Sequence, residues 1–421
     1  MDISSLMGNT KKPDGQAASP AFEYTAQAAS PYLTGEVKVT IGEHAFTVSS
    51  LFDTMEVRFA EVFGIVLSDY VVIVKTMEGD YFFSRMGQWA QPFCDALRAA
   101  YHGAFLRAFF LTGKPLVQAV GDVKVGELQP LRYACVSLFD NCIVILPPEG
   151  DALRIPLCFS VGMERGDHSF SITQKNGERY AFSRLGFDTL PLVEAIEGQI
   201  RSLREKAKAR LKALDPSLTD MQTSKLAKIM PLGAAAPMGR ISAIAPGFTE
   251  MLEQKIAGTR VADSFRAFSE LVEPGRIWVG VWQEVSSESD EADRVGGADE
   301  AARVDEASEK HGSLYLVAPS PSGQSAAVEF ALEDTATFVY RTNGDFEGFA
   351  DRLVQALEAS AFKREVIRLT DEELLRTGRE DYYMAAKRTD SLRFVRSHNT
   401  GRIIHSNPSA WRANLAVLWD F

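Results

Sequence analysis

Two histidines near the carboxyl end of the chain are the side chains whose types and spacing come closest to a chemical site. His398 and His405 lie seven residues apart in the segment SHNTGRIIHSN, among amide and hydroxyl side chains. Imidazole can transfer a proton or bind a metal ion near neutral pH. This spacing matches no standard metal-ligand pattern, and no acidic residue lies between the two histidines. We therefore expect both to pack in the fold or face solvent, and we predict no catalytic residue, metal or cofactor.

The same region carries a concentration of positive charge. Between Lys387 and Arg412 the chain has six basic residues and one acidic residue, a net charge of +5. Basic side chains interleaved with aromatic ones can bind phosphate groups, anionic lipid or an acidic protein segment. A solvated surface, or ion pairs with neighbouring modules, would explain the same charges. The candidate ligand-binding residues are Arg393, Arg396, His398, Arg402, His405 and Trp411.

Signatures of common enzymes are missing from the sequence. It contains no G-x-S-x-G nucleophile elbow, no Walker A loop, no H-E-x-x-H and no G-x-G-x-x-G. The four cysteines include no C-x-x-C pair, which zinc ribbons and thioredoxin-like sites require. We therefore predict a protein that is not an enzyme.

An internal repeat organises the chain. YFFSRMGQWAQP, from Tyr81, matches YAFSRLGFDTLP, from Tyr180, at a constant spacing of 99 residues without a gap. The tetrapeptide SLFD also occurs twice, at 50–53 and at 137–140. The same words in the same order indicate a duplicated module. The matching positions are Tyr81, Phe83, Ser84, Arg85, Gly87 and Pro92 in the first copy and Tyr180, Phe182, Ser183, Arg184, Gly186 and Pro191 in the second.

A third, more diverged copy is expected at 338–357, where Gly344 takes the position of Gly87 and the Ser-Arg pair and the proline are lost. In each copy, short runs rich in Val, Ile, Phe and Tyr precede the glycine and indicate antiparallel strands. After the glycine, apolar residues recur every three or four positions, which predicts an amphipathic helix. Each module is therefore predicted to be an antiparallel sheet followed by one helix.

Several strands closed by a C-terminal helix are the plan of a pleckstrin-homology-like (PH-like) module. The chain resembles a family of uncharacterised bacterial proteins with tandem PH-like modules and the recurrent pattern G-x-x-Y-x-x-S-x-L-G. This pattern is carried by Gly177, Tyr180, Ser183, Leu185 and Gly186, and with one residue deleted by the copy that starts at Gly79. The resemblance covers about residues 40–421. It implies an α+β fold of three modules, each an antiparallel curved sheet or small barrel closed by its helix, and it supplies no catalytic residues.

Composition and the repeat together predict the domain boundaries. Residues rich in Ala, Ser, Gln, Gly and Pro begin the chain, prolines and helical runs separate the second copy from the third, and a hydrophilic stretch interrupts the third. We expect a disordered leader at 1–34, module 1 at 35–112, module 2 at 127–214, a helical connector at 215–273, module 3 at 274–362 with a disordered acidic loop at 286–312, and a C-terminal extension at 363–421 packed on module 3.

The net charge of −11 argues against nucleic acid as a partner. The segment from Glu284 to Lys310 holds −7 of this charge, which leaves −4 for the rest of the chain. No secretory signal or transmembrane segment is visible, so we expect a cytoplasmic protein, free or peripheral to the membrane. Two functions stay open: a scaffold that binds a protein or peptide through PH-like modules, and recognition of anionic lipid or a phospho-ligand through the basic C-terminal stretch. An enzyme that uses His398 and His405 ranks last.

Overall fold

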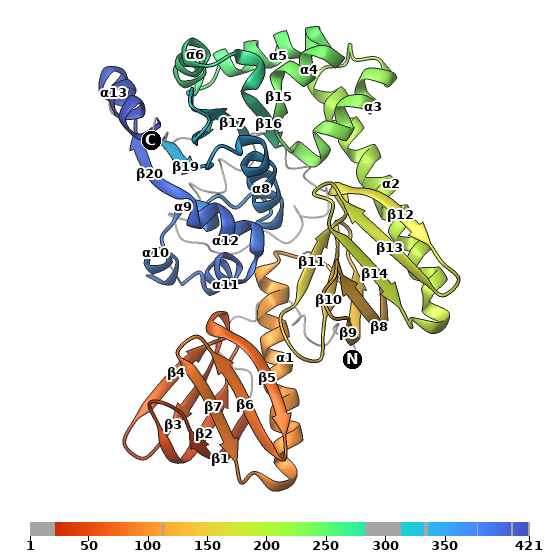
Figure 1. Ribbon diagram of the computed structural model, residues 1–421, viewed down its shortest axis with the longest axis vertical. Helices are drawn as coiled ribbons and strands as arrows, with labels where there is room; N and C mark the ends of the chain where they lie inside the picture. The colour runs from red at the N-terminus through yellow and green to blue at the C-terminus, as the bar shows by residue number, and fades with distance from the viewer. Residues whose placement is uncertain are drawn as a thin grey trace, which may run out of the picture. The chain divides into compact units, whose positions relative to one another are not determined.

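The chain is an α+β protein with three antiparallel sheets and twelve helices in the residues that the structure describes (Figure 1). The structure is a computed structural model, which describes residues 22–111, 113–282, 313–331, 336–376, 378–405 and 407–419. The predicted acidic loop at 286–312 lies outside these residues. The chain folds as two compact units: unit 1 combines Met1–Ile200 with Ala359–Arg393, and unit 2 combines Arg201–Glu358 with Phe394–Phe421. None of the described helices has the length and apolar character needed to cross a membrane.

The first sheet, in unit 1, contains seven antiparallel strands. They are β1 Phe22–Ala29, β2 Thr34–Ile41, β3 Ala45–Ser49, β4 Thr54–Arg58, β5 Val62–Ser68, β6 Val71–Thr76 and β7 Gly79–Ser84. Their spatial order is β4-β3-β2-β1-β7-β6-β5, so β1 joins a four-stranded half to a three-stranded half. Because β4 and β5 remain edges, the sheet is open, and the alternative of a small closed barrel is not what this module forms.

Helix α1, Ala90–Ala108, follows this sheet and packs on β5 and β6. The predicted apolar stripe of Phe93, Leu97, Tyr101 and Phe105 is buried along its length. Residues spaced by three or four lie on one face of a helix, which explains why this face turns to the sheet.

The second sheet, also in unit 1, repeats the same plan. Its strands are β8 Val117–Val125, β9 Leu131–Leu138, β10 Cys142–Leu146, β11 Leu153–Pro156, β12 Ser160–Arg165, β13 Ser169–Gln174 and β14 Arg179–Ser183. The order is β11-β10-β9-β8-β14-β13-β12, and helix α2, Thr189–Leu214, follows β14. Strand for strand, this arrangement matches that of the first sheet.

The repeat extends to backbone detail at the turn between the last strand and the helix. Arg85 and Arg184 have φ of +60° and +57°, and Gly87 and Gly186 have φ of +55° and +59°. A Cβ added at either glycine would meet nothing within 4 Å, so the backbone angle and not crowding favours glycine there. The repeated motif therefore encodes one strand-to-helix turn used twice.

The second repeated word, SLFD, does not mark equivalent positions, and this part of the prediction was wrong. Residues 50–53 form the turn between β3 and β4, where Leu51 and Phe52 are exposed. In contrast, Leu138 ends β9, and both Leu138 and Phe139 are buried. A four-residue word is too short to define a strand register, which depends on pairing with distant strands.

Two predicted boundaries also need correction. Strand β1 lies inside the region 1–34 that was predicted to be a disordered leader, and β8 begins before the predicted start of module 2 at 127. Each of these strands pairs with the last strand of its own module, β7 or β14, so each completes its sheet. The β1 sequence FEYTAQAA is rich in small and polar residues, which explains why its strand signal is weak.

The third sheet, in unit 2, departs from the plan expected for module 3. Its strands are β15 Ala236–Pro237, β16 Trp278–Trp282, β17 Ser313–Pro319, β18 Ser325–Phe330, β19 Ala336–Arg341 and β20 Asn399–Ile404, in that spatial order. Helix α8, Phe346–Ala359, follows β19, and Gly344 has φ of +84° at the turn between them. The outer strands β15 and β20 come from the predicted connector and C-terminal extension. This sheet therefore has six strands drawn from three predicted domains.

The connector is helical, with α3 Asp220–Ile229, α4 Met238–Ile244, α5 Pro246–Ala257 and α6 Ala262–Leu271. Phe248, Leu252 and Ile256 of α5 are buried in one core with Val279 and Leu316 of the sheet. The connector is thus part of the body of unit 2 and not a linker between bodies.

The C-terminal extension divides between the two units, so the prediction that it packs as a whole on module 3 was wrong. Helices α9 Glu365–Arg368, α10 Asp371–Arg376 and α11 Glu380–Arg388 belong to unit 1, where α11 packs on α1. Asp381 of α11 lies 3.2 Å from Arg107 and 3.4 Å from His44. Burial alone would raise the pKa of Asp381, but the hydrogen bond from His44 and the charge of Arg107 lower it. Strand β20 and helix α13, Pro408–Trp419, belong to unit 2.

Candidate functional site

The basic residues near the C-terminus belong to two different units. Lys387, Arg388 and Arg393 lie in unit 1, whereas Arg396, Arg402 and Arg412 lie in unit 2. Most of them have acidic partners that lie elsewhere in the sequence or one helical turn away. These ion pairs join Lys387 to Asp371, Arg388 to Asp151, Arg393 to Asp390 and Arg412 to Glu270. The +5 charge of this stretch is therefore largely balanced within the fold.

Arg388 belongs to a network inside unit 1. Its guanidinium donates to Asp151 and lies 3.2 Å from the hydroxyl of Tyr101. That hydroxyl also lies 2.6 Å from the Asp151 carboxylate and 2.9 Å from the carbonyl oxygen of Val62. Burial raises the pKa of Tyr101, so this phenol stays protonated and able to donate. The network ties α11 and α1 to the turn between β10 and β11.

His405 and Trp411 belong to a buried network in unit 2. The indole N–H of Trp411 donates to Thr337 Oγ1 at 2.7 Å. His405 Nε2 lies 3.0 Å from Thr337 Oγ1 and 3.0 Å from Glu329 Oε1, and the Thr337 hydroxyl donates to the same carboxylate oxygen. Glu329 and Thr337 have no exposed surface. The network joins β20 and α13 to β18 and β19.

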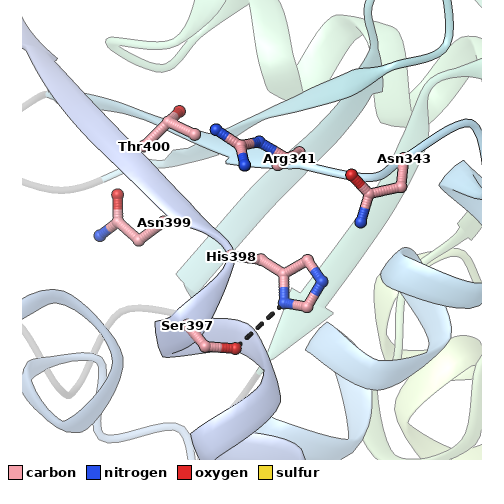
Figure 2. Close-up of a pocket in the computed structure, with 6 residues that line it drawn as sticks. All are labelled: Arg341, Asn343, Ser397, His398, Asn399 and Thr400. Atoms are coloured by element: carbon pink, nitrogen blue, oxygen red, sulfur yellow. Dashed lines mark hydrogen bonds between the residues drawn. The ribbon is translucent and has the colours of Figure 1, made fainter.

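His398 lies at the other end of β20, at its junction with helix α12, Asp390–Ser397. Six strand residues separate the two histidines, which corresponds to about 20 Å along an extended strand. His398 lines a polar pocket of about 190 Å³, shown in Figure 2. The pocket residues are Arg341, Asn343, Ser397, His398, Asn399 and Thr400. Of the six candidates from the sequence, only His398 lines this pocket, and the two histidines do not form one site.

A second candidate site, which the sequence analysis did not select, lies on the turns of module 1. Its members are Tyr32, Leu51, Phe52 and Met77, which we call the turn-end surface. Leu51 is 93% exposed and Phe52 is 97% exposed. The β1–β2 and β3–β4 turns close the same end of the sheet, because successive antiparallel strands reverse direction. The β6–β7 turn joins them, since a Cβ built on Gly79 would come within 2.6 Å of the Pro31 ring.

The β3–β4 turn holds Leu51 and Phe52 in an ordered backbone. The N–H of Ser50 donates to the carbonyl of Asp53 at 2.8 Å. The hydroxyl of Ser50 accepts from the N–H groups of Phe52 and Asp53 at 3.2 and 3.0 Å. Such a serine turn fixes the loop without using its apolar side chains, so Leu51 and Phe52 project outward.

The equivalent turn of module 2, between β10 and β11, is already occupied by contacts within unit 1. Glu149 of this turn lies 3.1 Å from Arg98 on α1, and Asp151 contacts Tyr101 as described above. Proline and polar residues replace the Leu-Phe pair there, in the sequence PPEGDA. The same turn therefore contacts a helix in one copy and carries exposed apolar side chains in the other.

No protein-family model matches the chain, and no curated protein matches its sequence.

Proposed function

We propose that this chain is a non-enzymatic interaction protein whose PH-like modules bind a protein or peptide partner, with the turn-end surface of module 1 as the docking site. The observation that carries the proposal is the exposure of Leu51 and Phe52 on a hydrogen-bonded turn. Burial of a large apolar side chain contributes about 1.5–3 kcal/mol, so this pair could contribute about 3–6 kcal/mol to binding. Exposed apolar clusters on ordered turns are typical of interaction sites.

The strand order supports the PH-like part of the proposal. In both modules of unit 1, the first four of the seven strands form one antiparallel meander and the last three form another. The first strand pairs with the last strand, and one helix follows the last strand. This is the plan that the sequence resemblance implied. Modules of this kind serve as binding platforms in unrelated proteins, so the step from fold to function rests on analogy.

The charges around the turn-end surface favour a particular kind of partner. Glu36, Asp53 and Glu78 are exposed on the same turns or at the adjoining strand start. An acidic rim repels an anionic membrane and attracts a basic surface. We therefore propose a partner segment that presents apolar side chains flanked by lysine or arginine. The β10–β11 turn of module 2 supports a helical segment in particular, because that turn contacts the helix α1 through Arg98 and Tyr101.

The proposal is tested by placing a photo-crosslinking amino acid at Phe52 in the full-length protein and mapping the crosslinked segment by mass spectrometry. The expected segment is apolar with basic flanks, and its purified peptide should bind the wild-type protein in solution. The double variant Leu51→Ser/Phe52→Ser should lose this binding. Its thermal unfolding should be unchanged, because both side chains are exposed in the folded chain.

A matched control is the double variant Phe187→Ser/Leu190→Ser, which removes two exposed apolar side chains from module 2 instead. It should bind the peptide as the wild-type protein does. Equal binding by the Leu51→Ser/Phe52→Ser variant would overturn the proposal, and so would a crosslinked segment that is acidic. Sedimentation with phosphatidylserine vesicles that depends on Leu51 and Phe52 would also contradict the proposed partner chemistry.

A further inference from the structure

The pocket at the junction of α12 and β20 has a lining made only of polar side chains. One of them, Arg341, is cationic, and none is acidic. Figure 2 shows that Arg341 and Asn343 come from one segment of the chain and that Ser397, His398, Asn399 and Thr400 come from a second. All six lining residues belong to unit 2, so the pocket is formed within one compact body.

Backbone hydrogen bonds hold the two walls of the pocket together. The N–H of Arg341, at the end of β19, donates to the carbonyl oxygen of His398 at 2.8 Å. The hydroxyl of Thr400 donates to the carbonyl of Val339 at 2.9 Å, and Tyr340 pairs with Asn399 in the sheet. Arg341, Asn399 and Thr400 are therefore positioned by strand pairing, whereas Asn343 lies on the turn between β19 and α8.

The ring of His398 has a defined hydrogen-bonding role. Its Nδ1 lies 2.8 Å from the carbonyl oxygen of Phe394, which can only accept a hydrogen bond. Nδ1 must therefore carry the hydrogen in this contact, which leaves Nε2 for other partners. The ring also lies against the ring of Phe394, with centroids 4.1 Å apart. Held in this way, His398 can present Nε2 to a bound group without rearrangement.

The carbonyl groups at the end of α12 do not counter the positive charge of the pocket strongly. The C-terminus of a helix carries a partial negative charge that disfavours anions. Here the carbonyl of Phe394 already accepts from the hydroxyl of Ser397 at 2.8 Å, from the N–H of His398 at 3.2 Å and from its Nδ1. These bonds reduce the negative potential at the base of the pocket, so Arg341 determines its sign.

We propose that this pocket binds a phosphate monoester. The guanidinium of Arg341 can donate two parallel hydrogen bonds to phosphate oxygens, and the amides of Asn343 and Asn399 add neutral donors from two other directions. A monoester presents three oxygens and a charge near −2, which uses donors on several sides better than a carboxylate does. The volume of about 190 Å³ is smaller than that of pockets for drug-sized ligands and suits a single charged group.

The test measures binding of inorganic phosphate to the full-length protein by isothermal titration calorimetry. Arg341→Gln should weaken the affinity about tenfold or more, because a charge-assisted hydrogen bond contributes about 1.5–3 kcal/mol. The matched control is Arg402→Gln, which removes the same charge from an exposed position on β20 outside the pocket. It should change the affinity little. Asn343→Asp, which keeps the shape of the side chain and adds a negative charge, should abolish binding.

Vesicle sedimentation distinguishes two sources of the monoester, a lipid headgroup and a soluble phosphate ester. If the protein sediments with phosphatidic acid vesicles but not with phosphatidylserine vesicles, and Arg341→Gln abolishes this sedimentation, the ligand of the pocket is a lipid headgroup. Binding of inorganic phosphate without such sedimentation would assign it to a soluble phosphate ester. The proposal is overturned if phosphate does not bind saturably, or if Arg341→Gln and Arg402→Gln weaken binding equally. Unchanged binding by Asn343→Asp would overturn it as well.

Discussion

Protonation of His102 is expected to weaken unit 1 in mild acid. His102 lies on α1 and is 5% exposed. It forms a hydrogen bond with the backbone of Pro147, and because proline has no N–H, the carbonyl must accept from the ring. Burial, which has the largest effect, and the charge of Arg98 together lower the pKa of His102 from 6.5 to about 4, against the opposing effect of the bond to Pro147. The folded chain therefore holds a neutral imidazole at neutral pH.

The size and sign of the effect follow from the two pKa values. Between about pH 6.5 and about pH 4 the unfolded chain binds a proton at His102 that the folded chain does not bind. The contribution of the neutral ring to stability is complete above about pH 6.5 and is lost as the pH falls toward 4. One pKa unit corresponds to about 1.4 kcal/mol, so the loss is about 2 kcal/mol at pH 5 and about 3 kcal/mol below pH 4.

Urea denaturation, followed by circular dichroism, measures this loss at about pH 7.5 and about pH 5, where an imidazole at its ordinary pKa is neutral and protonated respectively. The comparison variant is His102→Gln, whose amide can still donate to Pro147 but does not titrate. The free energy of unfolding of the wild-type protein should fall by about 2 kcal/mol more than that of the variant. His168→Gln, at an exposed position, serves as the control and should behave as the wild-type protein does. Equal losses in wild-type and His102→Gln proteins would refute the reasoning.

Three further substitutions test stability. Gly87→Ala should destabilise the protein by about 1 kcal/mol in urea denaturation, because its φ of +55° disfavours any residue with a Cβ. Gly198→Ala, in the interior of α2 with open space around the position, should instead stabilise it by up to about 1 kcal/mol, and a loss at Gly198 would contradict this account. Thr337→Val should cost about 1–3 kcal/mol, because it leaves the buried N–H of Trp411 and the carboxylate of Glu329 without their hydroxyl partner. A thermal unfolding curve of Thr337→Val that matches the wild-type curve would show that this network contributes nothing.

Much of unit 1 was predictable because its signals are local. The repeated motif at the strand-to-helix turn is only a few residues long. It depends on the positive φ of Gly87 and Gly186, which glycine adopts readily. The helices after it show their buried faces in the spacing of apolar residues, as Phe93 and Leu97 illustrate. The strands β1 and β8 were missed. Each pairs with the next strand but also with the last strand of its module, more than fifty residues away, and β1 is rich in small and polar residues.

The candidate sites were less predictable, because they depend on which residues meet and which stay exposed. His398 and His405 are close in sequence, but a strand between them separates them. Leu51 and Phe52 appeared in the sequence as half of a repeated word, and only the fold shows that they lie exposed on a turn. Arg341 and Asn343 lie within the third copy of the repeat and had no signal of their own, since their partners come from residues 397–400.

The sequence by itself determined the α+β class, the duplication and the turn between the last strand and the helix of the first two modules, because these depend on composition, on spacing and on the conformational freedom of glycine. Only the tertiary structure decided how the charges are used and where the C-terminal extension belongs. The six basic residues from Lys387 to Arg412 are close together in the sequence, but the fold divides them between two units. It also places acidic partners, such as Asp151 and Glu270, next to several of them. Electrostatic interactions depend on distance in space, and a linear sequence does not specify that distance for residues far apart along the chain.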